Sequence, residues 1–277
     1  MDYVELNLPV SDQQQAEIIT AWLSDFPFES FMQESGVLKA YITKDALCDC
    51  KDDIDHVLAG AGCSEHTYIE IESRNWNELW ESQFEPVDVE GLCTIRAPFS
   101  PPPASGLDIV IMPKMSFGTG HHATTWLMTS ELFRHDFSGL AGLDMGSGTG
   151  VLAIVAVHRG ARHVDAVDID QWAFENSVEN IRDNGVSDKI TPVLGDASVI
   201  AGKHYDFVLA NINRNILLSD MPRYAAALSD GGLLVMSGIL EKDIDAISRK
   251  ACELGFDIIS SRIRDGWAVV TCRLRNS

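Results

Sequence analysis

Residues 142–150 read Gly-Leu-Asp-Met-Gly-Ser-Gly-Thr-Gly and lead into the apolar run 151–157, Val-Leu-Ala-Ile-Val-Ala-Val. This pattern is typical of a buried strand end, a glycine turn and the start of a helix. Gly146, Gly148 and Gly150 stand at alternate positions, where they allow a positive φ and leave no Cβ in the way of a ligand. The free N–H groups of the following helix would face that ligand. The stretch therefore predicts a ligand site at the start of a βαβ unit.

Polar side chains follow the later strands of the same pattern. A second apolar strand, residues 163–168, ends at Asp168, 20 residues beyond Gly148. That spacing suits a carboxylate that holds the ribose of a nucleotide cofactor. Two further strand-like runs are followed by Asp196 and end at Asn211. Because open α/β sheets bind ligands at the carboxyl edge of their parallel strands, we expect these side chains to meet there.

The end of the chain sets the fold apart from a dehydrogenase. Two strand-like runs, 256–263 and 267–274, are joined by Asp265-Gly266, which predicts an antiparallel hairpin. Helical and strand patterns alternate before it. The sequence therefore predicts an α/β fold with a doubly wound sheet that closes in a terminal antiparallel hairpin.

The first 73 residues predict a second, smaller domain. Their elements follow the order β-α-β-β-α-β, with strands expected at 3–9, 28–34, 37–43 and 67–71 and helices after Asp12 and over 52–61. This order is typical of a small α+β, ferredoxin-like domain. We therefore expect three parts: a ferredoxin-like substrate-recognition domain at 1–73, a linker helix from Asn75 with a connecting segment at 74–106, and a catalytic domain at 107–277.

Composition excludes several classes of protein. The 277 residues carry a formal net charge of −20. Such an acidic chain repels phosphate backbones, so direct nucleic-acid binding is not expected. No apolar run is long enough to span a membrane and no signal peptide is visible, so we expect a cytoplasmic protein. Six cysteines without a C-x-x-C pair predict free thiols.

The excess of acid lies mostly in the small domain. Residues 1–85 hold 18 Asp and Glu against four Lys and Arg, whereas the remaining residues hold 23 against 17. One interpretation is a solvated surface that keeps the protein soluble. The other is an electrostatic surface for a basic partner.

A second glycine-rich stretch, residues 115–125, reads Met-Ser-Phe-Gly-Thr-Gly-His-His-Ala-Thr-Thr. Its place ahead of the cofactor turn predicts a lid or clamp over the ligand. Thr124 or Thr125 could equally serve only as a helix cap. Adjacent His121 and His122 do not converge easily on one metal ion, and no ligand partner stands at a suitable spacing, so no metal is expected.

The glycine turn also bears on the cofactor. Dinucleotide folds use G-x-G-x-x-G, whereas here the third glycine gives G-x-G-x-G and residue 151 is Val. Asp144 would repel a pyrophosphate but would attract a cationic ligand. S-adenosylmethionine carries a sulfonium and an amino group, and its ribose suits Asp168. This half of the chain resembles the class I S-adenosylmethionine-dependent methyltransferase fold.

The resemblance extends to one family. Four stretches, 117–125, 144–150, 167–170 and 210–212, look like PrmA, the bacterial ribosomal protein L11 methyltransferase family, and the acidic first domain and linker helix extend the likeness to nearly the full chain. The resemblance implies an S-adenosylmethionine-dependent protein-lysine N-methyltransferase that modifies lysine side chains, and an α-amino group, of ribosomal protein L11, its basic protein partner.

The resemblance also assigns site residues. It puts Thr125, Gly146, Asp168 and Asn211 at the cofactor, and Gly148 belongs there by its place in the turn. Related amine methyltransferases carry the motif Asn-Pro-Pro-aromatic, in which the Asn side-chain carbonyl accepts a hydrogen bond from the amine. Asn211 matches this Asn and is therefore the catalytic candidate. Here the stretch reads Asn-Ile-Asn-Arg, without an aromatic residue to stack on a flat target, which favours an aliphatic amine.

Three alternatives stay open at this point. The glycine turn and Asp168 would also fit an NAD-dependent oxidoreductase. A methyltransferase could act on another protein amine. The chain could also be a non-catalytic binding module whose acidic first domain holds a basic protein.

Overall fold

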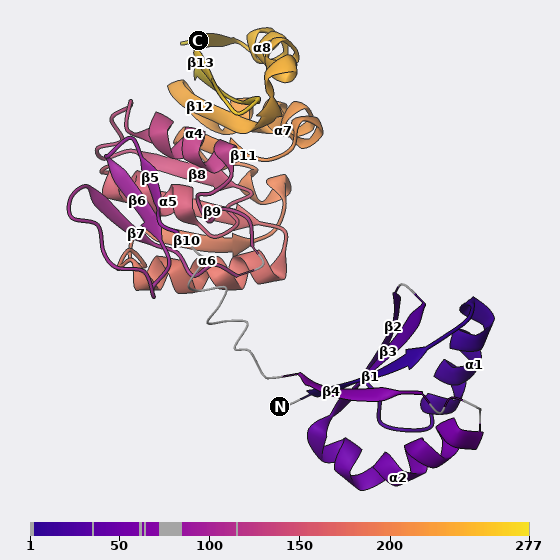
Figure 1. The fold of residues 1–277 in the computed structure, drawn as a ribbon. Coiled ribbons are helices and arrows are strands. Elements are labelled where there is room, and N and C mark those ends of the chain that lie inside the picture. The colour runs from indigo at the N-terminus through magenta and orange to yellow at the C-terminus, as the bar shows by residue number, and fades with distance from the viewer. Residues whose placement is uncertain are drawn as a thin grey trace. The chain divides into compact units, whose positions relative to one another are not determined.

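The computed structural model describes residues 3–34, 36–60, 63, 65–71, 85–114 and 116–276. The chain divides into two compact units, Met1–Gln83 and Phe84–Ser277 (Figure 1). Residues 75–84 of the predicted linker helix lie outside the described residues. None of the helices in the described ranges combines the length and the apolar character needed to cross a membrane. The six cysteines are free thiols, as the sequence predicted.

The first unit is an antiparallel sheet covered by two helices. Its elements are β1 (Tyr3–Pro9), α1 (Gln13–Leu23), β2 (Ser30–Glu34), β3 (Val37–Thr43), α2 (Lys44–Gly60) and β4 (Thr67–Ile71). The strands pair in the order β2-β3-β1-β4, and every pair is antiparallel. Alternate residues of β1, among them Leu6 and Leu8, are buried in one core with Ile19 of α1 and Ile54 of α2. The period of two along the strand therefore turns one face toward the helices.

Helix α2 begins earlier than the sequence predicted. We expected a helix over 52–61, but it starts at Lys44, directly after β3. The Thr43 hydroxyl accepts the Ala46 N–H at 3.3 Å and so caps the first turn. Leu47 lies on the buried face, seven residues before Ile54. Between Leu47 and Ile54 the sequence carries three aspartates, and they obscure the helical spacing of the apolar residues.

The second unit carries a seven-stranded sheet and a three-stranded one. The small sheet consists of β5 (Val87–Val89), β6 (Cys93–Arg96) and β7 (Leu107–Val110). The large sheet consists of β8 (Ala141–Met145), β9 (His163–Asp168), β10 (Ile190–Leu194), β11 (Tyr205–Asn211), β12 (Leu228–Leu240), β13 (Phe256–Arg264) and β14 (Trp267–Leu274). Its order is β10-β9-β8-β11-β12-β14-β13. The first five strands pair in parallel, and β14 is antiparallel to both of its neighbours. The predicted doubly wound sheet with a terminal antiparallel hairpin is confirmed.

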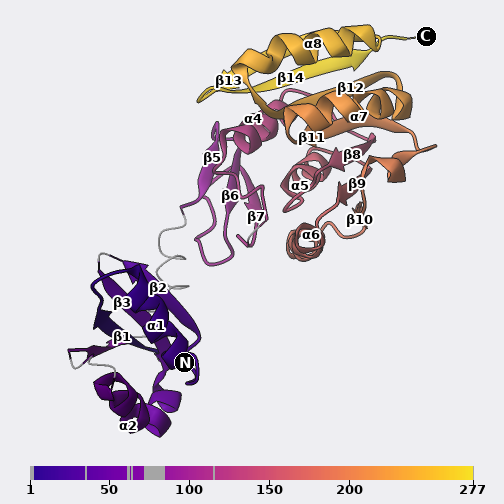
Figure 2. The same ribbon diagram turned by 90° about the vertical axis from the view of Figure 1, so that its right-hand side faces the viewer.

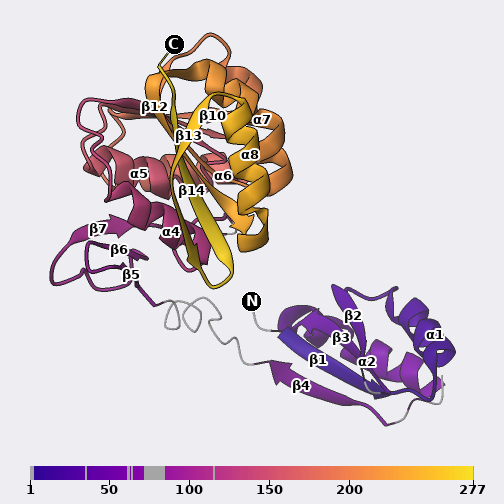
Figure 3. The same ribbon diagram turned by 90° about the horizontal axis from the view of Figure 1, so that it is seen from above.

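Helices cover both faces of the large sheet. They are α4 (Ala123–Leu132), α5 (Val151–His158), α6 (Gln171–Asp183), α7 (Arg214–Ala227) and α8 (Ile244–Glu253), with short 3-10 turns at Ala197–Ile200 and Glu241–Asp243. Successive residues of β11 point to opposite faces: Phe207 joins one core, with α4 and α5, and Val208 joins the other, with α7 and α8. Figure 3 shows these two helix pairs on opposite sides of the strands. The sheet is therefore buried on both faces, as parallel sheets require.

The small sheet packs into the second unit. Val89, Cys93, Ile95 and Ile109 belong to the same core as α5, and Figure 2 shows the three strands beside α4. The guanidinium of Arg96 on β6 donates two hydrogen bonds of 2.8 Å to Asp108 on β7. The domain boundaries predicted at 73/74 and 106/107 stay predictions.

Candidate functional site

Register brings the predicted residues to one edge of the large sheet. Met145 of β8 lies beside Val167 of β9 and Ala210 of β11. The next residues along these three adjacent strands are Gly146, Asp168 and Asn211. The sheet therefore places four of the five predicted site residues, Gly146, Gly148, Asp168 and Asn211, at the carboxyl ends of neighbouring strands or in the turn that follows.

The glycine turn is held by the backbone of β9. The N–H groups of Gly146 and Ser147 both donate to the Val167 carbonyl, at 2.8 and 3.0 Å. The Gly148 N–H donates to Asp168 Oδ2 at 2.8 Å. Asp168 Oδ1 accepts the Asp170 N–H at 3.0 Å. Each carboxylate oxygen of Asp168 thus holds one N–H and keeps a second lone pair for another donor.

The loop after residue 115 lies directly on this turn. The Phe117 carbonyl accepts the Thr149 N–H at 2.9 Å, and the Gly118 carbonyl accepts the Thr149 hydroxyl at 2.8 Å. A Cβ at Gly148 would lie only 2.2 Å from the Phe117 oxygen. The two glycine-rich stretches are therefore in contact, and the contact depends on the missing side chain of Gly148. The predicted role of the loop as a lid or clamp over the ligand stays a prediction.

Asn211 reaches the turn through its neighbour Ile212. A Cβ at Gly146 would lie 2.3 Å from Ile212 Cγ2, and one at Gly238 would lie 2.3 Å from the Ile212 carbonyl oxygen. Ile212 is therefore clamped between the glycine turn and the end of β12. This contact fixes the backbone that carries Asn211.

Thr125 lies in the first turn of α4. The helix is capped by His122, whose Nδ1 accepts the Thr124 N–H at 3.3 Å, so the alternative that Thr124 or Thr125 is only the cap is wrong. The His122 ring lies 5.1 Å from that of Phe117 and 4.6 Å from that of Trp267, between ring centroids. Trp267 pairs with Leu240 at the end of β12. The first turn of α4 therefore lies at the same edge as the glycine turn.

Several buried oxygen atoms at this edge have no hydrogen-bond partner in the protein. They are Thr125 Oγ1, Ser147 Oγ, Asn211 Oδ1 and Asp144 Oδ1. Such atoms are rare in folded proteins, and an ordered water or a ligand is one explanation for them. The sequence alone gives no signal for Ser147, although this residue stands inside the glycine turn.

Asp144 is the most perturbed of these groups. It is fully buried beneath the turn, where its Oδ2 accepts the Ala153 N–H of α5 at 3.1 Å. Burial raises the pKa of Asp144 to about 7, and the nearby Asp168 charge adds to the rise. A positive charge placed beside this carboxyl would stabilise its ionised form.

Other polar residues at the edge have structural partners. Asp196 caps the following 3-10 turn by accepting the Ser198 N–H at 2.8 Å, and Asn213 caps α7 by accepting the Ile216 N–H at 3.1 Å. Arg214 pairs with Asp243 at 3.0 Å. His121 Nε2 lies 3.0 Å from the Glu85 carbonyl oxygen. Within the described ranges, no three His, Cys, Asp or Glu side chains are grouped as metal ligands.

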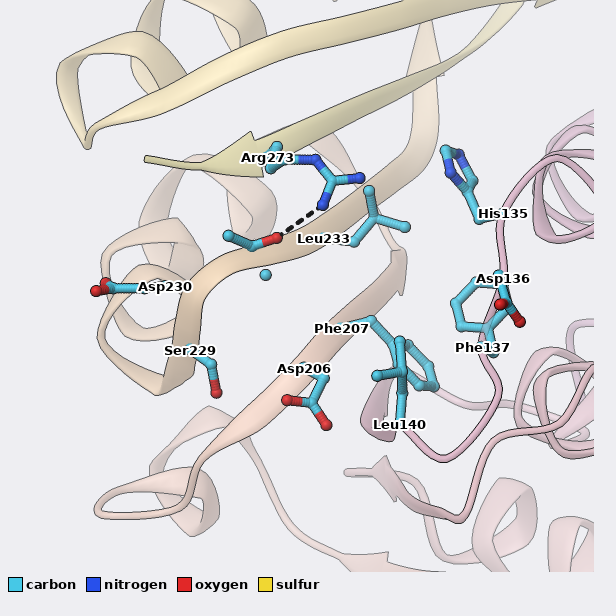
Figure 4. A pocket seen from close by; sticks show the side chains of 12 residues that line it. His135, Asp136, Phe137, Leu140, Asp206, Phe207, Ser229, Asp230, Leu233 and Arg273 are labelled. Atoms are coloured by element: carbon cyan, nitrogen blue, oxygen red, sulfur yellow. Dashed lines mark hydrogen bonds between the residues drawn. The ribbon is translucent and has the colours of Figure 1, made fainter. Parts of the chain in front are cut away.

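A separate cavity of about 370 Å³ opens at the opposite, amino edge of the sheet. Figure 4 shows Asp206 and Phe207 from the start of β11, with His135 and Arg273 at its rim. Arg273 donates to the Gly231 carbonyl at 2.9 Å. None of the predicted site residues lines this cavity.

Known proteins match this chain along nearly its whole length. The family model described as ribosomal protein L11 methyltransferase (PrmA) matches residues 9–275. A ribosomal protein L11 methyltransferase of Bacteroides thetaiotaomicron is 41% identical over 279 aligned residues, covering 98% of this chain and 99% of that protein. One from Porphyromonas gingivalis is 42% identical over 261, covering 92% and 89%. The crystal structure of a ribosomal protein L11 methylase from Lactobacillus delbrueckii subsp. bulgaricus superposes with a TM-score of 0.62 at 26% identity, over 70% of this chain and all of that one.

The contact between the loop and the glycine turn can be tested with Gly148→Ala. The new methyl would overlap the Phe117 carbonyl, so we expect the loop to lift from the turn and the Thr149 amide to exchange at least tenfold faster. Hydrogen exchange read by mass spectrometry measures this. Gly185→Ala is the matched control, because Gly185 also has a positive φ but no atom within 4 Å of an added Cβ. Equal exchange in both variants would contradict the contact.

Proposed function

The chain belongs to the ribosomal protein L11 methyltransferase (PrmA) family, and we propose that it transfers methyl groups from S-adenosylmethionine to amines of ribosomal protein L11. The acceptors proposed are lysine side chains and the α-amino group. A ribosomal substrate also supports a cytoplasmic location. An NAD-dependent oxidoreductase is not proposed further, because the family and the terminal hairpin both point to a methyltransferase.

The unpartnered oxygens at the carboxyl edge carry the proposal. Thr125 Oγ1, Ser147 Oγ and Asn211 Oδ1 are each buried without a partner. Leaving one such group unsatisfied costs about 1–3 kcal/mol. A polar ligand that donates to and accepts from these three side chains offsets that cost, so the residues present fit a cofactor rich in hydroxyl and amino groups.

The protein's own groups suggest how S-adenosylmethionine is held. Asp168 keeps a free lone pair on each oxygen for the two ribose hydroxyls. Gly146 and Gly148 leave the turn without side chains, so the cofactor can approach the backbone. Asp144 lies beneath the turn and favours the positive charge of the amino acid part and the sulfonium. Bound there, S-adenosylmethionine supplies an electrophilic methyl group on its sulfonium sulfur.

Asn211 is the proposed catalytic residue. Its side-chain carbonyl accepts an N–H of the incoming amine and so turns the nitrogen lone pair toward the methyl group. Holding donor and acceptor in line can supply about 7–11 kcal/mol of the barrier reduction. The lysine ammonium gives up one proton to water before it attacks, because the lone pair must be free. Residues 211–214 read Asn-Ile-Asn-Arg, so Arg214 stands where related amine methyltransferases carry an aromatic residue, and this favours an aliphatic amine over a flat base.

The first unit is proposed as the substrate-recognition domain. Residues 1–85 hold 18 acidic side chains against four basic ones, whereas a basic substrate carries the opposite charge. Long-range attraction between them raises the association rate and falls with ionic strength. The alternative of a surface that only promotes solubility predicts no such dependence on salt.

The proposed reaction can be tested by incubating the purified enzyme with methyl-labelled S-adenosylmethionine and dissociated ribosomes, which supply ribosomal protein L11 together with other ribosomal proteins and RNA. We expect label on L11 and mass increases in methyl-sized steps on its lysines or its N-terminus. An unlabelled L11 alongside a labelled second ribosomal protein would move the proposal to another amine substrate. Label in RNA would contradict it altogether.

Asp168→Ala tests the proposed cofactor contact. Losing two hydrogen bonds to a charged group should weaken S-adenosylmethionine binding about a hundredfold while the unit stays folded. Isothermal titration calorimetry measures the affinity and circular dichroism checks the fold. Asp196→Ala is the control, because that carboxylate caps a 3-10 turn at the same edge, and its effect should stay below about threefold.

Cofactor affinity should also depend on pH through Asp144. Its carboxyl is neutral well below pH 7 and ionised above it, because burial raises the pKa of Asp144 to about 7. A cationic ligand binds the ionised form more tightly, so affinity should rise with pH up to about 7, by at most about tenfold per unit, and then level off. Titration calorimetry between pH 5.5 and 8.5 measures this. Asp144→Asn should flatten the profile, and an unchanged slope in that variant would assign the titration to another group.

A further inference from the structure

Glu131 is a buried carboxylate that the proposed reaction does not use. It lies on α4 and is 2% exposed. Its Oε1 accepts from the Thr271 hydroxyl at 2.9 Å, the Ser260 hydroxyl at 3.1 Å and His135 Nε2 at 3.2 Å. Burial alone would raise the pKa of Glu131, but these hydrogen bonds outweigh burial and lower it to about 2. The side chain is therefore ionised and fully engaged.

Arg262 extends this cluster to the turn between β5 and β6. Its Nη1 donates to the Ser130 hydroxyl at 2.8 Å and lies 3.4 Å from Glu131 Oε2. Its Nη2 donates to Glu90 Oε1 at 2.9 Å. Glu90 stands in the turn between β5 and β6 with a φ of 56°, a conformation that costs energy for a residue with a side chain. One guanidinium thus joins α4, β13 and a strained turn.

Hydrogen bonds can help to fix the rotation of helix α4, because the helix is buried on nearly every side. Eight of its ten residues are buried, namely Thr124, Thr125, Leu127, Met128, Thr129, Ser130, Glu131 and Leu132. A helix that is buried all round has no amphipathic stripe to select one face. Directional hydrogen bonds to Glu131 can select it. Trp126 adds one more, from its Nε1 to the Asp88 carbonyl at 2.9 Å.

The rotation of α4 decides where Thr125 points. Thr125 precedes Glu131 by six residues, which is about 9 Å along the helix axis. Its hydroxyl is buried and lacks a protein partner, so no hydrogen bond fixes its direction. We propose that Glu131, held by Arg262, is a positioning residue that sets the rotation of α4 and so aims the Thr125 hydroxyl at the cofactor. This inference rests on the proposed use of S-adenosylmethionine.

A double-mutant cycle with Glu131→Gln and Thr125→Val tests it. Glutamine keeps the volume but loses the charge that Arg262 and His135 contact. Each single variant should weaken S-adenosylmethionine binding roughly three- to tenfold, about the value of one well-placed hydrogen bond. If Glu131 acts through Thr125, the double variant should bind within about twofold of Thr125→Val alone. Titration calorimetry on the full chain measures all four affinities.

A merely structural role would not give this pattern. Asp165→Asn is the matched control, because Asp165 is also buried and accepts from three partners, His163, Lys203 and Tyr205, none of them on α4. It should lower the melting temperature as Glu131→Gln does, yet leave the affinity within about twofold. If Glu131→Gln does not fold, Arg262→Gln replaces it in the same cycle.

The outcomes separate the inference from the proposed function. Two results would overturn the positioning role alone. One is a double variant whose loss of affinity equals the product of the two single losses. The other is a folded Glu131→Gln or Arg262→Gln protein that binds S-adenosylmethionine as tightly as the wild type. A wild-type protein that does not bind S-adenosylmethionine would overturn the proposed function together with the inference.

Discussion

The candidate site depends on one steric constraint, the close approach of other segments to the glycine turn. A Cβ at Gly146 would overlap Ile212, and one at Gly148 would overlap the Phe117 carbonyl. These two absent side chains allow the segment with Asn211 and the loop before α4 to touch the same turn. The Gly148 N–H then orients Asp168. A short backbone stretch thereby sets the positions of Asp168 and Asn211, which come from two strands, and of the loop before α4.

This arrangement has an energetic cost that the rest of the unit must offset. Unpartnered oxygens and the buried Asp144 carboxyl each oppose folding. Apolar cores on both faces of the sheet supply the opposing free energy, because successive residues of each central strand join different cores. The site residues therefore stand at strand ends and in a turn that are anchored on a sheet buried on both faces, which keeps their geometry close to the one that the ligand needs.

Local patterns in the sequence predicted the parts of the fold and site that depend on neighbouring residues. The glycine turn, the strand end at Asp168 and the terminal hairpin follow from spacing alone. The start of α2 was wrong by eight residues, because acidic residues interrupt its apolar period. The role of Glu131 gave no signal, since its partners Ser260 and Thr271 stand 129 and 140 residues later in the chain. Such long-range contacts are set by the fold and not by local sequence.

The two ends of α4 show how a binding site can be both polar and ordered. A hydroxyl that binds a ligand, as proposed for Thr125, has no protein partner in the free protein, so no hydrogen bond fixes its direction. Glu131, by contrast, is satisfied by groups from β13 and β14 and by His135, which follows the end of α4. A helix transmits orientation because its backbone is stiff over two turns. The helix therefore transmits the fixed orientation of Glu131 to Thr125. Burial of the Glu131 carboxylate opposes folding, but this carboxylate lies away from the ligand and does not compete with it.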